Sequence, residues 1–132
     1  MSVGRLTHRA DFLRIAGRGR KWVTPGLILQ VAPRPALADG SEEKGLRIGF
    51  TVSRRVGNAV ARNRVRRRLR AAVREVLAVH GKAGRDYVVI GRRSSLTRPY
   101  GALVQDLGMA LERLDSFAGP RPAGGAGPRG KA

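Results

Sequence analysis

The alternation of apolar and polar residues along the chain predicts three β-strands. The clearest covers residues 46–53, where every second side chain is apolar. These apolar positions are Leu46, Ile48, Phe50 and Val52. Residues 22–32 form a second apolar run with Pro25 near its start, which is typical of an edge strand or a late strand start. Residues 86–92 are rich in β-branched side chains and predict a buried strand. The stretch 33–45 holds two prolines and two glycines and predicts a solvated hairpin loop.

Apolar residues at helical spacing predict three helices. A short helix follows Thr7 as its N-cap and ends at Gly17, with Phe12, Leu13 and Ala16 on one face. The longest helix covers 59–79, is entered through Gly57–Asn58 and ends at His80–Gly81. Its apolar stripe consists of Val65, Leu69, Ala72, Val73, Val76 and Leu77. The last helix covers about 100–117, with its stripe at Leu103, Leu107, Leu111 and Leu114.

The elements follow in the order α-β-β-α-β-α, which predicts an α+β domain built as a two-layer α/β sandwich around a small sheet. The strands 46–53 and 86–92, with the long helix between them, form a βαβ unit. We expect one domain over residues 1–118. Residues 119–132 hold five glycines and three prolines without a large apolar side chain, so we expect a disordered basic tail there.

The charge of the chain narrows the class of partner. The chain contains twenty-seven Lys and Arg residues and nine acidic residues, which gives a net charge of +18 on 132 residues. Such a charge repels itself and points to a polyanionic partner. There is no cysteine and no apolar run near the ~20 residues of a membrane span. The N-terminus lacks the apolar stretch of a secretory signal, so we expect a cytoplasmic protein.

Arginines dominate the region around the start of the long helix. Nine lie between Arg54 and Arg74, where there is no acidic residue. A step of ~100° per residue puts most of them opposite the apolar stripe. Arg62 and Arg68 come closer to the core edge and are expected to lean outward. A solvated charged face is the alternative, but it would pair opposite charges four residues apart. A membrane-bound helix would carry bulkier apolar residues than Val, Ala and Leu. The pattern favours nucleic acid.

Catalytic and metal-binding groups are not evident in the polypeptide. His8 and His80 are far apart and have no neighbouring ligands at metal spacing. The carboxylates are scattered, whereas a two-metal nuclease needs them clustered. We therefore predict neither a protein catalytic site nor a protein metal site, and neither a membrane nor a small-molecule substrate as partner.

The run from Val56 to Arg67, VGNAVARNRVRR, resembles the signature of the protein subunit of bacterial ribonuclease P, with Arg62-Asn63-Arg64 as its core. The flanking RIGFTVSRR and RDYVVIGR segments resemble that family too, and the likeness covers about residues 5–117. The resemblance implies a left-handed βαβ crossover at the basic helix. It also implies a partner, the catalytic RNA subunit, which holds most of the Mg²⁺ and cleaves the 5′ leader from precursor tRNA.

The resemblance implies two groups of binding residues. The positions that match contacts to the RNA subunit, or flank them, are Arg54, Arg55, Asn58, Arg62, Asn63, Arg64, Arg66, Arg67 and Arg70. The expected cleft for the single-stranded leader comprises Phe12, Ala16, Trp22, Ile28 and Gln30. Ala16 and Gln30 stand where the family often has aromatic residues, which predicts a weaker leader site or one that uses Trp22 instead.

Three other functions are alternatives, and the first of them would share both the charge and the fold. A structural RNA-binding protein, such as a ribosomal protein, would leave precursor-tRNA cleavage unchanged. A DNA-compacting protein would bind duplex DNA and structured RNA equally, with a steep dependence on salt. A stand-alone nuclease would cleave without any added RNA.

Overall fold

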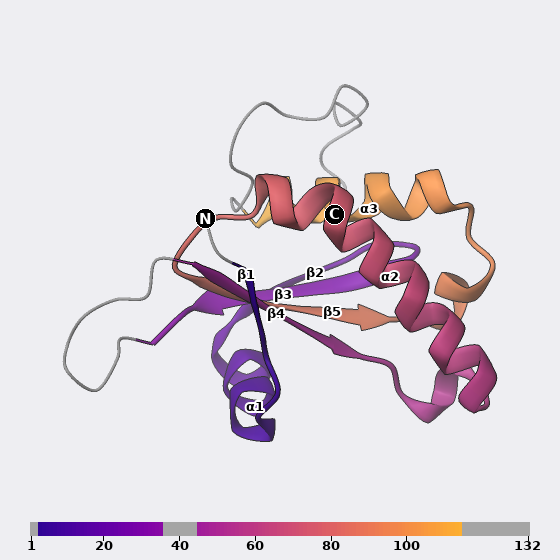
Figure 1. Ribbon diagram of the computed structural model, residues 1–132, viewed down its shortest axis with the longest axis horizontal. Helices are drawn as coiled ribbons and strands as arrows, with labels where there is room; N and C mark the ends of the chain where they lie inside the picture. The colour runs from indigo at the N-terminus through magenta and orange to yellow at the C-terminus, as the bar shows by residue number, and fades with distance from the viewer. Residues whose placement is uncertain (1–2, 36–44, 115–132) are drawn as a thin grey trace.

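The computed structural model describes residues 3–35 and 45–114, which form a five-stranded sheet with helices on both faces (Figure 1). The strands are β1 Val3–Arg5, β2 Arg20–Val23, β3 Leu27–Pro33, β4 Leu46–Thr51 and β5 Arg85–Gly91. The α-helices are α1 Arg9–Arg18, α2 Ala59–His80 and α3 Tyr100–Arg113. Two short 3-10 helices, η1 Arg54–Val56 and η2 Arg93–Leu96, precede α2 and α3. The predicted α+β class is confirmed.

The sheet has the order β1-β4-β5-β3-β2, in which β4 is parallel to both β1 and β5. β4, α2 and β5 form the predicted βαβ unit. In Figure 1 both strands run from left to right, β5 lies above β4, and α2 passes on the viewer's side of them. The crossover is therefore left-handed, as the resemblance implies, although such connections are right-handed in nearly all proteins.

The larger core lies between the sheet and the helices α2 and α3. All six positions of the stripe predicted for the long helix are buried, and so are the four leucines predicted for the last helix. They pack against Leu27 and Leu29 of β3, Leu46 of β4, and Tyr87 and Val89 of β5. Each of these side chains is removed from water, which fixes α2 on the sheet.

The short helix α1 lies on the opposite face of the sheet. Its buried residue is Ile15, which packs in a smaller cluster with Leu6, Ala32 and Val88. The face expected to carry Phe12, Leu13 and Ala16 is not the buried one, because Leu13 and Ala16 are exposed and Phe12 is half-buried. A two-layer sandwich thus describes the α2 and α3 face, and α1 covers part of the other face.

The strand predictions need three corrections. β1 was not predicted. The run 22–32 is two strands, β2 and β3, which pair as a hairpin whose turn contains Pro25. The stretch 33–45 is not a hairpin loop, because β5 lies between β3 and β4 in the sheet. A proline has no N–H for a strand ladder, which explains why the chain turns at Pro25.

The helix ends also differ slightly from the prediction. His8, not Thr7, is the N-cap of α1, and the helix continues through Gly17 until the Gly19 N–H donates to the Ile15 carbonyl at 2.8 Å. The predicted end of the last helix, the tail 119–132 and most of the stretch 33–45 fall outside the described residues. None of the helices within 3–35 and 45–114 is long and apolar enough to cross a membrane.

Candidate nucleic-acid interface

The loop before α2 contains a glycine with positive φ and an N-cap residue, which together fix where the helix begins. Gly57 has a φ of 151°, a conformation that essentially only glycine adopts. Asn58 is the N-cap, and its side-chain oxygen accepts a hydrogen bond from the Ala61 N–H at 2.9 Å. The Arg62 guanidinium donates to the Gly57 carbonyl at 3.0 Å. Asn58 and Arg62, both predicted to contact RNA, therefore also hold the loop in place.

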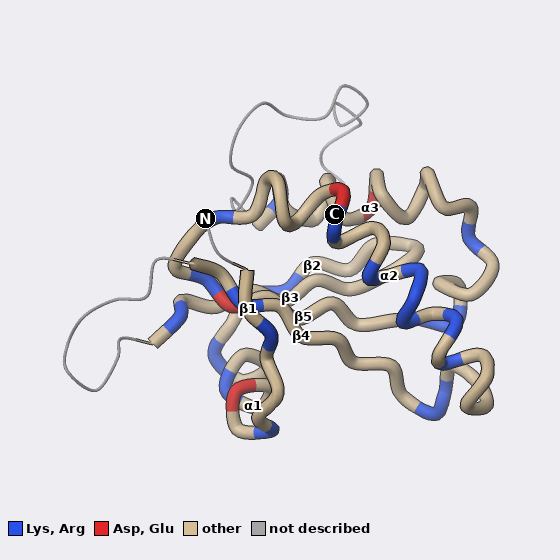
Figure 2. Tube along the Cα trace, viewed as in Figure 1, with Lys and Arg blue, Asp and Glu red and all other residues tan. Residues whose placement is uncertain are grey.

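The exposed arginines form a basic face over η1 and the first half of α2. Figure 2 shows cationic positions and no anionic ones along this stretch. Arg54 and Arg55 are exposed on η1, and Arg64 and Arg67 are exposed on α2. We call these four residues, with Asn63, the arginine face. Asn63, Arg64 and Arg67 also line a shallow pocket together with Leu96.

The charges of the arginine face are not neutralised by the protein. In the described part of the chain, the ion pairs with carboxylates involve Arg14, Arg47 and Arg98, none of which lies between 54 and 74. Arg66 donates to the side-chain oxygen of Asn63 at 3.5 Å, which adds no opposite charge. The face is therefore an unscreened field of guanidinium groups, which suits bidentate contacts to phosphate.

Arg68 does not lean outward as predicted. Its guanidinium points into the η2 turn, where it donates to the carbonyls of Ser95 at 3.0 Å and Leu96 at 2.8 Å, and also to that of Arg98. Arg68 thus ties α2 to the segment after β5. Its role is structural, because three backbone acceptors occupy its donors.

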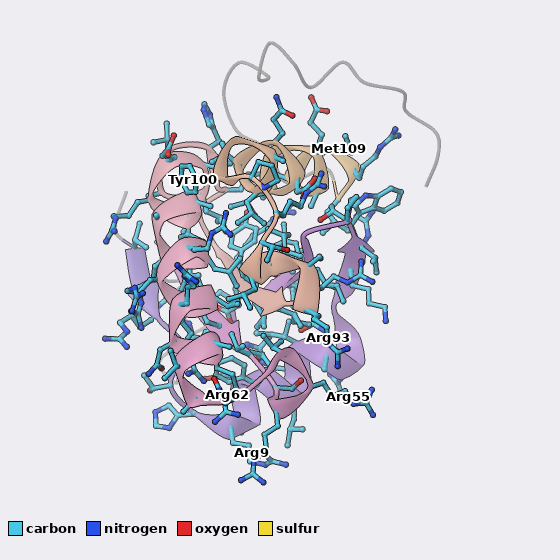
Figure 3. The ribbon with its side chains drawn as sticks, turned by 90° about the vertical axis from the view of Figure 1, so that its right-hand side faces the viewer. Arg9, Arg55, Arg62, Arg93, Tyr100 and Met109 are labelled. Atoms are coloured by element: carbon cyan, nitrogen blue, oxygen red, sulfur yellow. The ribbon has the colours of Figure 1, made fainter. Side chains whose placement is uncertain are left out.

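Arg93 lies beside the arginine face, although it was not among the predicted RNA contacts. Its guanidinium donates to the Arg55 carbonyl at 3.1 and 3.3 Å, which brings η2 beside η1. Figure 3 shows Arg55, Arg62 and Arg93 at the same end of the molecule, with Arg9 from the start of α1. Arg93 lies far from the basic run in sequence, so the fold alone reveals this neighbourhood.

The face of the sheet beside α1 is partly open and forms the candidate cleft. The strand register places Val23, Ile28, Ile90 and Thr51 in one row across β2, β3, β5 and β4. The next row holds Gln30, Val88 and Gly49. The Phe12 ring lies over Gly49, because a Cβ on that glycine would sit 2.6 Å from the ring. Ile28 and Gln30 are half-buried on this face.

The cleft opens between α1 and α2, where one pocket is lined by Thr7, Arg9, Phe12, Phe50, Thr51, Val52 and Arg66. Two aromatic rings and two arginines therefore border the same cavity. Phe50 was predicted to lie on the apolar side of its strand. It packs against the main core but remains half-buried, so part of its ring faces this opening.

Trp22 does not lie in the cleft. It pairs with Leu29, whose side chain is in the main core, so the two point to the α3 side of the sheet. There the Arg113 guanidinium lies 5.6 Å from the Trp22 ring centroid. Since Phe12 is on the opposite face, the suggestion that Trp22 replaces a cleft aromatic is wrong.

Among the residues that the structure describes, no group of three His, Asp or Glu residues is placed to hold a metal ion. Desolvation, and then a hydrogen bond to Glu75, raise the pKa of Tyr100 from 10.0 to about 12. This phenol lies where α2 meets α3, far from the arginine face in Figure 3. It therefore stays protonated at neutral pH.

The fold and these surfaces are those of a nucleic-acid-binding protein of the α+β class. A family model described as "Ribonuclease P" matches residues 2–115. The ribonuclease P protein component of Paramagnetospirillum magneticum is 58% identical over 115 residues, which is 87% of this chain and 85% of that protein. That of Gluconacetobacter diazotrophicus is 50% identical over 109 residues, 83% of this chain and 89% of that protein.

Solved structures agree with the sequence comparisons. The ribonuclease P protein of Staphylococcus aureus superimposes with a TM-score of 0.69 at 25% identity, over 86% of this chain and 96% of that one. That of Thermotoga maritima gives 0.64 at 26% identity, over 83% and 94%. The chain belongs to the ribonuclease P protein family. It is thus a component of the enzyme that matures the 5′ end of tRNA, and it works with an RNA subunit.

Proposed function

We propose that the chain binds the RNA subunit through the arginine face, Arg62 and Arg66, and binds the 5′ leader of precursor tRNA in the cleft beside α1. In this way it promotes endonucleolytic removal of the leader. The protein supplies binding energy and positioning, while the RNA and the Mg²⁺ ions that it holds supply the chemistry.

One observation carries the RNA-subunit part of this proposal. The exposed arginines of η1 and α2 have no carboxylate partner among the described residues, although Arg14, Arg47 and Arg98 elsewhere do. Like charges this dense destabilise a folded protein unless an anion neutralises them. An RNA backbone does so and releases its counterions, which favours binding at moderate salt.

The cleft suits a single strand rather than a duplex. Its floor is the half-buried row with Ile28 and Ile90, and Phe12 stands at its side. Unpaired bases stack on an aromatic ring and bury their faces against apolar side chains, whereas a paired helix hides those faces. Arg9 and Arg66 at the opening are placed to meet the phosphates between bases.

The protein is suited to assist the chemistry without performing it. Asp86, the carboxylate nearest to the cleft floor in the strand register, is fully buried and already accepts hydrogen bonds from Arg47 and Arg14. It is therefore not free to hold a catalytic metal ion. We assign the Mg²⁺ sites of the reaction mainly to the RNA subunit.

The test is to measure the affinity of the RNA subunit for the variant Arg64→Ala/Arg67→Ala. Both side chains are exposed, so the variant removes charge without opening the core. We expect weaker binding and a salt slope reduced by about 0.7–0.9 for each lost phosphate contact. The control Arg18→Ala/Arg113→Ala removes the same charge from α1 and α3 and is expected to lose much less. Equal losses in both variants would show nonspecific attraction and refute the proposed interface.

A further inference from the structure

We propose that Phe50 and Arg70 form a nucleotide-stacking site at the uncovered edge of β4, and that it takes an unpaired base of the leader beyond the one that stacks on Phe12. The proposal rests on the leader cleft proposed above. The site adds Phe50, which was not among the predicted cleft residues, and Arg70, which the family resemblance assigns to the RNA subunit.

The edge of β4 is open where this site lies. β1 pairs with β4 from Leu46 to Ile48, and the Leu6 N–H adds one hydrogen bond to the Ile48 carbonyl at 3.0 Å. The chain then leaves the sheet to begin α1. Within the described residues, the side of β4 from Gly49 to Thr51 that faces away from β5 is therefore not covered by another strand.

Phe50 and Arg70 are in cation–π contact at this edge. The Arg70 guanidinium lies over the Phe50 ring, 6.0 Å from its centroid. Phe50 is half-buried and anchored in the main core, whereas Arg70 is exposed on α2. A planar guanidinium held against a ring keeps its outer face available, and that face stacks on a nucleobase. The pair is therefore a preformed platform with a positive charge.

Phe50 connects the cleft to a second pocket. It borders the opening that contains Phe12 and Arg66, and also a groove beneath α2 lined by Arg5, Arg70 and Arg74. Neither lining includes a carboxylate. A ligand that continues from Phe12 around the sheet edge thus meets a flat stacking surface and then cationic side chains. A single strand of RNA has this alternation of planar bases and phosphates.

The leader is a better occupant than the RNA subunit because Phe50, one half of the site, borders the same cavity as Phe12. The Phe50–Arg70 pair would also compensate for Ala16 and Gln30, which stand where the family often has aromatic residues. An aromatic–arginine platform placed at the rim of the cleft supplies stacking that the exposed Ala16 and the half-buried Gln30 cannot.

The test uses the reconstituted holoenzyme with Arg70→Lys, which keeps the charge and removes the planar stack. Lysine keeps the charge that attracts phosphate but offers no planar face to a base. Loss of a bidentate phosphate contact would weaken binding of the RNA subunit itself, whereas loss of a leader stack would weaken only leader-dependent binding. The matched control is Arg113→Lys, which breaks the Arg113–Trp22 stack on the other face of the sheet. We expect Arg70→Lys to weaken binding of precursor tRNA about five- to twentyfold, as the loss of one stacked base predicts. Binding of mature tRNA and of the RNA subunit is expected to stay unchanged.

A series of precursors with progressively longer leaders locates the subsite. The variant Phe12→Ala first identifies the leader nucleotide whose contribution to affinity requires Phe12. The loss of precursor-tRNA affinity in Arg70→Lys is expected only for leaders that extend past that nucleotide. A fluorescent base such as 2-aminopurine, placed at each leader position in turn, should be quenched at that nucleotide in the wild type and not in Arg70→Lys. Phe50→Leu is expected to show the same pattern, with its fold checked by thermal unfolding.

The outcomes separate this proposal from the leader cleft itself. If Phe12→Ala loses leader-dependent affinity and Arg70→Lys does not, the cleft stands and the Phe50–Arg70 site is refuted. If Arg70→Lys weakens binding of the RNA subunit or of mature tRNA equally, the pair contacts the RNA subunit and the proposal is wrong. If neither variant responds to leader length, the cleft proposal fails as well.

Discussion

The most demanding prediction concerns Asp86, the buried carboxylate that ties α1 to the sheet. Its side chain is 0% exposed and accepts two hydrogen bonds from Arg47, at 2.8 and 2.7 Å, and one from Arg14 of α1. Arg14 also donates to the Pro33 carbonyl at 3.1 Å. α1 buries just one residue, Ile15, so these polar contacts carry much of its attachment.

The expected cost of Asp86→Asn follows from this geometry. Removing one partner of a buried ion pair costs about 3–5 kcal/mol. The Arg14 and Arg47 side chains are 24% and 21% exposed, so water can hydrate the guanidinium groups that lose their partner and reduces the cost. The amide introduced by Asp86→Asn also keeps one oxygen that accepts a hydrogen bond. We therefore expect a loss of about 2–3 kcal/mol, a large share of the stability of a small domain.

Urea unfolding of wild type, Asp86→Asn, Arg14→Met and the double variant measures this cost and the Asp86–Arg14 coupling. A coupling above about 1 kcal/mol is expected for groups in direct contact. The variant Asp86→Asn should also weaken leader-dependent binding, because α1 carries Phe12, while RNA-subunit affinity changes little. A stability loss below about 0.5 kcal/mol, typical of a surface site, would refute the reasoning.

Three further predictions concern single side chains. Gly57→Ala should lower the free energy of unfolding in urea by about 1–3 kcal/mol. The φ of 151° strains an L residue, and the new Cβ would lie 2.9 Å from that of Ala61. The control Gly17→Ala, in α1, places its Cβ in open space and should not destabilise the protein. Tyr100 should titrate near pH 12 by NMR, and Glu75→Gln should bring its pKa part of the way back toward 10.0. Because the folded pKa is raised, the stability that the phenol contributes is present below pH 10 and is lost as pH rises toward 12. Trp22→Leu should reduce stability and leave leader affinity unchanged; a leader-dependent loss would contradict its placement on the α3 face.

The long helix was predictable because its environment is regular. A buried stripe repeats every 3.6 residues whatever it packs against, so its six buried positions could be read from the sequence. The exposed arginines followed from the same geometry. Arg68 was the exception, because its partners are carbonyls of η2, which the fold brings alongside α2.

The cleft was less predictable because it depends on pairing between distant segments. The face on which Trp22 lies is set by the register of β2 on β3. The sequence predicted a single strand over 22–32, because Pro25 was interpreted as an interruption near the strand start and not as part of a hairpin turn. Phe50 alternates with core residues, yet its partial exposure depends on where β1 stops pairing with β4. A three-residue strand such as β1 carries too little pattern to be recognised alone. The handedness of the βαβ crossover came from the family resemblance, since periodicity carries no information about it.

Cleavage of precursor tRNA at low Mg²⁺ by the RNA subunit, with and without the protein, tests the two proposed surfaces most directly. Wild-type protein should stimulate cleavage strongly. Arg64→Ala/Arg67→Ala should lose that stimulation for every precursor at limiting protein, whereas Phe12→Ala should lose it only for precursors with a leader long enough to reach the cleft. Stimulation that survives in both variants, or cleavage by the protein without the RNA subunit, would contradict the assignment of the arginine face and the cleft.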